Sequence, residues 1–108
     1  MPGKQPPLGI AVVRGRSMEP TLRDGDRLLI HYGGRVRPGD LVVVRLTDRP
    51  VSVKRADHRV DGGWWVVRDN PDDGVDSWTV GAVAEHDVVA VVVKRVWPLV
   101  LRRRRRAG

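Results

Sequence analysis

Two side chains of this sequence could together cleave an amide bond: the hydroxyl of Ser17 and the amine of Lys54. A serine hydroxyl attacks a carbonyl at useful rates only when a neighbouring base takes its proton. A lysine can be that base where apolar surroundings disfavour its ammonium form and bring its pKa down from about 10.4. Because serine and lysine are scarce in this chain, we take the two as a candidate nucleophile and general base.

The residues around Lys54 are expected to hold its amine on an apolar strand. Alternate side chains of a strand share a face, so Lys54 lies with Ser52 and Ala56, whereas Val53 and Arg55 point to the other side. No acidic residue is directly adjacent, and the small neighbours leave room for a second side chain to reach the amine. We therefore expect a lowered pKa for Lys54.

Ser17 is expected on an irregular connection just after a strand. Residues 10–13 have the composition of a strand, and Pro20 disfavours a helical conformation at Glu19. Gly15 lets a peptide backbone come close because it has no Cβ. The main-chain amide of Ser17 is a candidate oxyanion donor, and the sequence does not locate a second one. Taken alone, a serine in this context is most often a simple turn residue.

Short strands must position these side chains. Runs rich in valine and isoleucine alternate with clusters of Gly, Pro, Asn and Asp, and no stretch shows helical periodicity. The expected strands are residues 10–13, 28–30, 41–46, 51–53, 64–67 and 88–93. We predict an all-β fold of compact, twisted antiparallel sheets, partly barrel-like, in which the serine turn and the lysine strand meet at one edge. A peptide could add there as an extended strand.

Three segments resemble, in the same order, the conserved segments of type I signal peptidases. They are residues 15–22 with 24–26, residues 39–44 with 53–56, and residues 68–70 with 76–77 and 81–83. The resemblance covers most of residues 10–96 and implies a signal peptidase-like catalytic core. It also implies that Ser17 is the catalytic nucleophile and Lys54 the general base of a serine endopeptidase.

The resemblance implies supporting roles for further residues. The oxyanion and substrate cleft would include Gly15, Arg16 and Met18. The loop that supports the lysine would include Asp69, Asn70, Asp76, Ser77 and Gly81. Three positions depart from the pattern. Gly74 stands where many members have a serine that orients the lysine, and Trp78 stands where an arginine often follows the Asp-Ser pair. Gly15 stands where some members have a residue whose hydroxyl donates to the oxyanion.

The length of 108 residues suits one domain. We expect a flexible N-terminal segment at residues 1–9, the peptidase domain at 10–97 and a basic tail at 98–108. The formal net charge is +7, and Arg102 to Arg106 supply five of the positive charges. Such a run could bind an anionic membrane or nucleic acid, although the lack of interleaved aromatic residues favours a disordered, solubilising end.

Residues 1–9 contain no apolar segment, so we expect neither a secretory signal nor an N-terminal anchor, and we predict a cytoplasmic enzyme. The chain has no cysteine, which excludes disulfides and thiolate chemistry. The three histidines lack the short spacing of metal ligands, so we expect no metal or cofactor. A serine triad through Asp57 and His58 is disfavoured because neighbours in a strand face opposite ways.

By its small size, absent anchor and general likeness, the chain resembles the maturation proteases of nickel-type superoxide dismutase. The substrate would then be the N-terminal extension of a precursor protein, bound as an extended peptide. Three alternatives stay open: a signal peptidase-like enzyme peripheral to the membrane, a self-cleaving regulatory domain of the repressor type, and a non-enzymatic β module that binds nucleic acid. Cleavage of another protein is preferred, because only sixteen residues precede Ser17.

Overall fold

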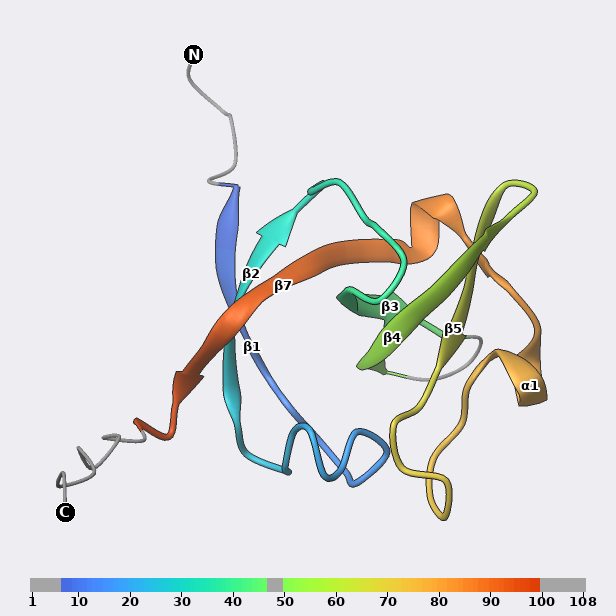
Figure 1. Ribbon diagram of the computed structural model, residues 1–108. Coiled ribbons are helices and arrows are strands. Elements are labelled where there is room, and N and C mark those ends of the chain that lie inside the picture. Colours follow the sequence, from blue (N-terminus) through green and yellow to red (C-terminus); the bar gives the residue numbers. More distant parts are fainter. Residues whose placement is uncertain (1–6, 47–49, 100–108) are drawn as a thin grey trace, which may run out of the picture.

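The computed structural model describes residues 7–46 and 50–99, and within them one antiparallel sheet forms the body of the protein (Figure 1). The strands are β1 (Leu8–Val12), β2 (Arg27–Tyr32), β3 (Leu41–Arg45), β4 (Val51–Val60), β5 (Gly63–Val67), β6 (Val83–Ala84) and β7 (Val88–Trp97). They pair in the order β1-β2-β7-β3-β4-β5-β6, and the sheet curves into a half-barrel. Two short helices, α1 (Ser77–Val80) and the 3₁₀ helix η1 (Glu85–Asp87), flank β6.

The predicted all-β fold is confirmed, and each predicted strand lies within or overlaps an observed one. The strand predicted at 51–53 is the start of the much longer β4, in which residues 57–59 are polar and exposed and therefore interrupt the apolar pattern. Strand β6 has two residues and was too short to predict. No helix in the described part of the chain is long and apolar enough to cross a membrane.

The first and last strands can be compared with the predicted domain bounds, which stay a prediction. Strand β1 begins at Leu8, inside the segment 1–9 that was expected to precede the domain. Strand β7 ends at Trp97, where the predicted domain ends. The arginine run 102–106 lies outside the described residues, so the expected solubilising end and the alternative of contacts with membrane or nucleic acid both stay predictions.

Alternate side chains of β3 and β4 divide the core into two apolar clusters. Val43 and Val53 belong to a first cluster, together with Met18 from the turn after β1. Val44 and Ala56 belong to a second cluster. Because both faces of β3 are covered, its valines form a continuous apolar run rather than an alternating one.

This arrangement brings three distant segments together around the middle of β4. β1 leads into turns at residues 15–22, and β5 leads into an irregular loop at residues 68–76. Figure 1 shows the blue turn segment and the yellow loop side by side at the end of the sheet, and a backbone hydrogen bond from Asn70 to Ser17 joins them. The fold therefore places the nucleophile candidate on a turn and the base candidate on a strand.

Candidate active site

Ser17 and Lys54 meet although 37 residues separate them along the chain. A hydrogen bond of 2.6 Å joins Lys54 Nζ and Ser17 Oγ. The lysine is 3% exposed on β4, and the serine is half-buried on the turn after β1. A hydroxyl and a primary amine in this contact can exchange a proton, which is the chemistry that the sequence indicated.

The pair lies in a cavity of about 520 Å³. Its walls come from residues 14–17, from β4 with the residue before it, and from residues 73–75 of the loop after β5. Leu46, Val51 and Val75 make part of the lining apolar, while Arg14 and Arg16 add positive charge. A cavity of this size can hold a few residues of a peptide.

Asn70 fastens the serine turn to the loop after β5. Its backbone N–H donates to the carbonyl oxygen of Ser17 at 2.8 Å, and its side-chain Nδ2 donates to the carbonyl oxygen of Arg16 at 2.9 Å. The backbone of the nucleophile candidate therefore cannot shift without breaking one of these bonds. Asn70 acts on the turn rather than on the lysine.

Asp69 ties the same turn to β4. Arg55 donates two hydrogen bonds to it, from Nε at 2.9 Å and from Nη2 at 2.7 Å, and the Thr21 hydroxyl donates a third. The hydrogen bonds from Arg55 hold the pKa of the Asp69 carboxyl below its usual value, against the opposing effect of burial, and Thr21 adds to this lowering. The Asp69 carboxylate in turn raises the pKa of Arg55. The ion pair keeps the arginine charge on the face of β4 opposite the lysine amine.

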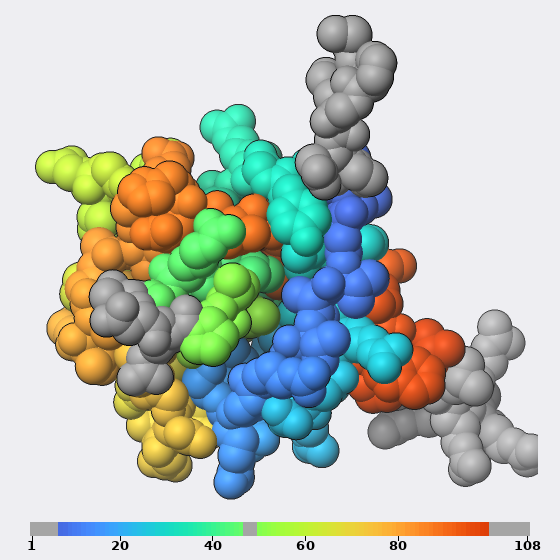
Figure 2. Space-filling model, turned by 180° about the vertical axis from the view of Figure 1, so that it is seen from behind, coloured from blue at the N-terminus to red at the C-terminus, as the bar shows by residue number. Residues whose placement is uncertain are grey.

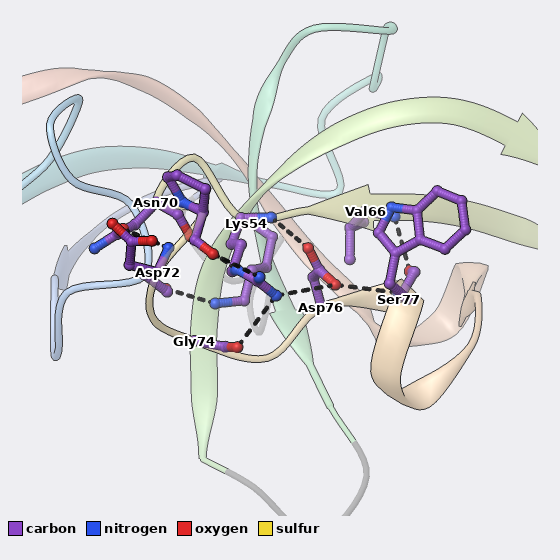
Figure 3. A network of polar contacts seen from close by, with 11 residues as sticks. Lys54, Val66, Asn70, Asp72, Gly74, Asp76 and Ser77 are labelled. Carbon is purple, nitrogen blue, oxygen red and sulfur yellow. Dashed lines mark hydrogen bonds and ion pairs between the residues drawn. The ribbon is translucent and has the colours of Figure 1, made fainter.

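Side chains after β5 fix the shape of the loop itself (Figure 3). The Asp76 carboxylate accepts hydrogen bonds from the backbone N–H groups of Arg68 and Trp78, and the Ser77 hydroxyl accepts one from Val66 N–H. The Arg68 guanidinium donates to the carbonyl oxygens of Asn70 and other loop residues. Asp76 and Ser77 are almost fully buried, so they anchor the loop to β5.

The loop passes so close to the nucleophile candidate that only glycine fits at position 74. Gly74 has a φ of +112°, and a Cβ on it would overlap the Cα and Cβ atoms of Ser17. Both facts exclude a side chain there. The serine that many signal peptidases have at the corresponding place would not fit in this chain, which gives a physical reason for the departure seen in the sequence.

Ser52 belongs to the candidate site, although the sequence analysis named it only as a small residue on the same face of the strand as Lys54. Its side chain lines the same cavity as Ser17 and Lys54. Its Oγ is buried and has no hydrogen-bond partner among the described residues, although buried hydroxyls normally have one. Its position two residues before Lys54 on one strand was the available signal, since such residues share a face.

Six of the ten predicted site residues do not line the cavity: the four loop residues described above, which are Asp69, Asn70, Asp76 and Ser77, and in addition Met18 and Gly81. Met18 is 1% exposed and packs in the first core cluster beneath the turn. Gly81 ends α1 with a φ of +86°, and its N–H donates to the carbonyl oxygen of Ser77. Gly15 and Arg16, by contrast, line the cavity as expected for cleft residues.

The expected side-chain directions of Asp57 and His58 on β4 were wrong. Asp57 and His58 were expected to face opposite ways, but His58 Nδ1 lies 2.7 Å from Asp57 Oδ2. A register shift between Ala56 and His58 breaks the alternation of the strand there and brings the two side chains together. Neither lines the cavity that holds Ser17. Residues 7–46 and 50–99 contain no group of side chains that could hold a metal ion.

Comparisons with known proteins agree with this site at the level of family. A family model described as peptidase S24-like matches residues 2–93, a span that includes both Ser17 and Lys54. The chain is also similar to mitochondrial inner membrane protease subunit 1 of Xenopus tropicalis. The two are 28% identical over 116 aligned positions, which cover 83% of this chain and 70% of the relative.

The first prediction concerns the close approach of Gly74. Gly74→Ala should destabilise the protein by about 1–3 kcal/mol more than Gly62→Ala, because overpacking adds to the backbone strain. Gly62 is a matched control, since it also has a positive φ but has no atom within 4 Å of the place that a Cβ would occupy. Urea denaturation of both variants measures the difference. Equal losses of stability would show that the contact with Ser17 imposes no constraint.

The second prediction concerns pH. Because the pKa of Asp69 is lowered from 3.8 in the folded protein, its contribution to stability is present above that value and is lost as the pH falls through the lowered one. Asp69→Asn should cost ~1–3 kcal/mol at neutral pH, the range for losing charge-assisted hydrogen bonds. In acid, the free energy of unfolding of the Asp69→Asn variant should approach that of the wild type.

The exposed Asp61, which has no hydrogen bond or ion pair with other described residues, provides the control Asp61→Asn. That variant should follow the wild type in urea denaturation at every pH. A constant gap between Asp69→Asn and the wild type, from neutral pH to strong acid, would contradict the role given to the Asp69 carboxylate.

Proposed function

This chain belongs to the peptidase S24-like family, and from that premise we propose that it is a serine endopeptidase in which Ser17 is the nucleophile and Lys54 the general base. One observation carries the proposal: Ser17 Oγ and Lys54 Nζ lie 2.6 Å apart. The cavity around them supports it, because it is open to solvent and large enough for an extended peptide. A peptide substrate follows from the family.

In the first step, the neutral Lys54 amine accepts the proton of the Ser17 hydroxyl while Oγ attacks the carbonyl carbon of the scissile bond. Burial of the amine disfavours its charged form and so favours this role. Negative charge develops on the carbonyl oxygen of the substrate. The main-chain N–H of Ser17, which donates to no acceptor among the described residues, is the proposed oxyanion donor.

The second half of the reaction returns the enzyme to its starting state. As the carbon–nitrogen bond breaks, the Lys54 ammonium gives its proton to the leaving amine, and the acyl group stays on Ser17 as an ester. A water molecule then attacks the ester carbon and gives a proton to the Lys54 amine. That proton passes to Ser17 Oγ when the ester breaks, and a carboxylic acid is released.

Ser52 has a proposed role in both halves of the reaction. Whenever Lys54 holds the proton, a buried ammonium group needs hydrogen-bond acceptors. The Ser52 hydroxyl is buried in the same cavity and shares the face of β4 with the lysine. We assign it as a positioning residue that accepts a hydrogen bond from the protonated amine.

The proposed substrate is the N-terminal extension of a precursor protein, specifically the precursor of nickel-type superoxide dismutase, and the proposed location is the cytoplasm. The choice of precursor rests on the general likeness to such maturation proteases. The cavity supports binding of an extended segment with small side chains, because Leu46, Val51 and Val75 offer shallow apolar contacts.

A second candidate is a signal peptidase-like enzyme that works at a membrane surface. It is favoured by the name of the Xenopus relative, which is a protease of the mitochondrial inner membrane. Self-cleavage of the repressor type is a third candidate, and the intact mass of the purified protein after long incubation tests it. A stable mass would leave cleavage of another protein as the remaining mode.

The third prediction tests the nucleophile and the base. Co-expression with a nickel-type dismutase precursor should yield processed dismutase with the wild type, and processing should fall ~10³-fold or more with Ser17→Ala or Lys54→Met. Lys94→Met is the matched control, because Lys94 is exposed on β7 and lies outside the cavity. Mass spectrometry of the dismutase reads out the result.

Profiling of protein N-termini in the same cells tests the choice of substrate separately from the assignment of peptidase activity. If the precursor stays intact while other proteins are cleaved only by the wild type, the dismutase is the wrong substrate and the peptidase assignment stands. If Ser17→Ala leaves every cleavage unchanged, the nucleophile assignment is wrong.

The fourth prediction concerns Ser52. Ser52→Ala should lower kcat by ~10–100-fold, the value of one hydrogen bond to a charged group, with little change in KM. Ser52→Thr, which keeps the hydroxyl, should restore most of the loss. A purely structural role would instead lower the thermal stability of Ser52→Ala and leave kcat unchanged in the fraction that remains folded.

A further inference from the structure

A second cavity lies at the opposite end of β4 from the catalytic one. Its volume is about 680 Å³, and its lining includes the loop after β2, the end of β4 and η1. Figure 2 shows the teal loop before β3 and the orange segment around η1 close together at the top of the molecule, and Figure 1 shows the same neighbours from the other side. Nothing in the proposed peptidase reaction uses this cavity.

Positive charge dominates the lining. Arg35, Arg37 and Arg59 all line the cavity, and Glu85 is the acidic residue among the lining residues. Glu85 is already paired with Arg59, whose Nη2 lies 3.1 Å from its carboxylate. Arg35 and Arg37 form no ion pair with a carboxylate in the described part of the chain. Two exposed guanidinium groups therefore border one cavity, and the nearby Asp40 carboxylate accepts a hydrogen bond from the backbone N–H of Arg37 rather than from its side chain.

Val36 connects this part of the lining to the core. It stands between the two arginines and packs against the second core cluster, and all three residues line the cavity. Both arginines are exposed.

Part of the cavity lining is apolar. It consists of Val36, Val88 and Trp64, and the tryptophan is 3% exposed. The guanidinium of Arg59 lies over the Trp64 ring, 5.3 Å from its centroid. An apolar wall strengthens the attraction between the arginines and an anion, because it lowers the local dielectric constant.

From these contacts we infer that this cavity binds a compact polyanion carrying phosphate groups. The planar fork of a guanidinium matches the oxygen pairs of a phosphate, and two such forks favour a ligand with several negative oxygens. Because Arg59 covers the Trp64 ring, the site offers no free aromatic face to stack a base. Recognition is therefore of the phosphate portion, whether it belongs to a soluble phosphate ester or to a lipid headgroup.

The test uses inorganic pyrophosphate as the probe and the full chain labelled with nitrogen-15. At about 0.15 M salt, where the Debye length is about 8 Å, titration should produce saturable NMR shifts at the Gly33 and Gly34 amides and at the Trp64 indole N–H, with little change at Ser17. Arg35→Gln combined with Arg37→Gln should weaken binding at least about tenfold, as expected for losing charge-assisted hydrogen bonds.

A double variant with the same loss of charge provides the control. Arg23→Gln combined with Arg45→Gln removes two exposed arginines that do not line the cavity. It should leave the affinity within about twofold, because exposed charges beyond the Debye length are largely screened. Equal weakening by both double variants, or shifts that never saturate, would overturn the site and indicate unspecific charge attraction.

Vesicles distinguish the two sources of phosphate. If the site accepts a headgroup, vesicles with phosphatidic acid should bind the protein, vesicles of phosphatidylcholine alone should not, and pyrophosphate should displace the first kind. If only the soluble anion binds, the ligand is a soluble phosphate compound. Binding of RNA without any binding of pyrophosphate would overturn the proposal.

Discussion

The contact between Ser17 and Lys54 depends on holding a turn against a strand that is far away in sequence. The turn after β1 has little regular structure of its own, so hydrogen bonds to the loop after β5 fix it. Asn70 binds its backbone, and Asp69 links Thr21 in the turn to Arg55 on β4. The loop after β5 therefore does more for the position of Ser17 than for the surroundings of Lys54.

Separation of charge along β4 is the second constraint. Arg55 follows Lys54 directly, and a free cation beside the amine would disfavour the ammonium that Lys54 must form whenever it accepts a proton. The strand sends the two side chains to opposite faces, and Asp69 neutralises the arginine on its own face. Continuing along the same strand, Arg59 reaches the second cavity. One strand thus contributes to two different sites without mixing their electrostatics.

A single apolar cluster lies between these two sites. Leu46 and Val75 border the cavity that holds Ser17 and Lys54, Trp64 and Val88 border the arginine-lined one, and all four belong to the second core cluster or pack against it. Close packing makes such a cluster stiff. The two cavities therefore sit on a common rigid body, and each is formed by loops attached to it.

The sequence by itself determined the all-β class, the family resemblance, and the choice of Ser17 and Lys54, because strand patterning and short motifs are local properties of the chain. Only the tertiary structure decided how these parts meet. The bulge that joins Asp57 to His58, the contact that requires glycine at position 74, and the buried hydroxyl of Ser52 all depend on packing between segments distant in sequence. Pattern reading cannot supply these features, since close contacts across the fold are set by the whole core at once.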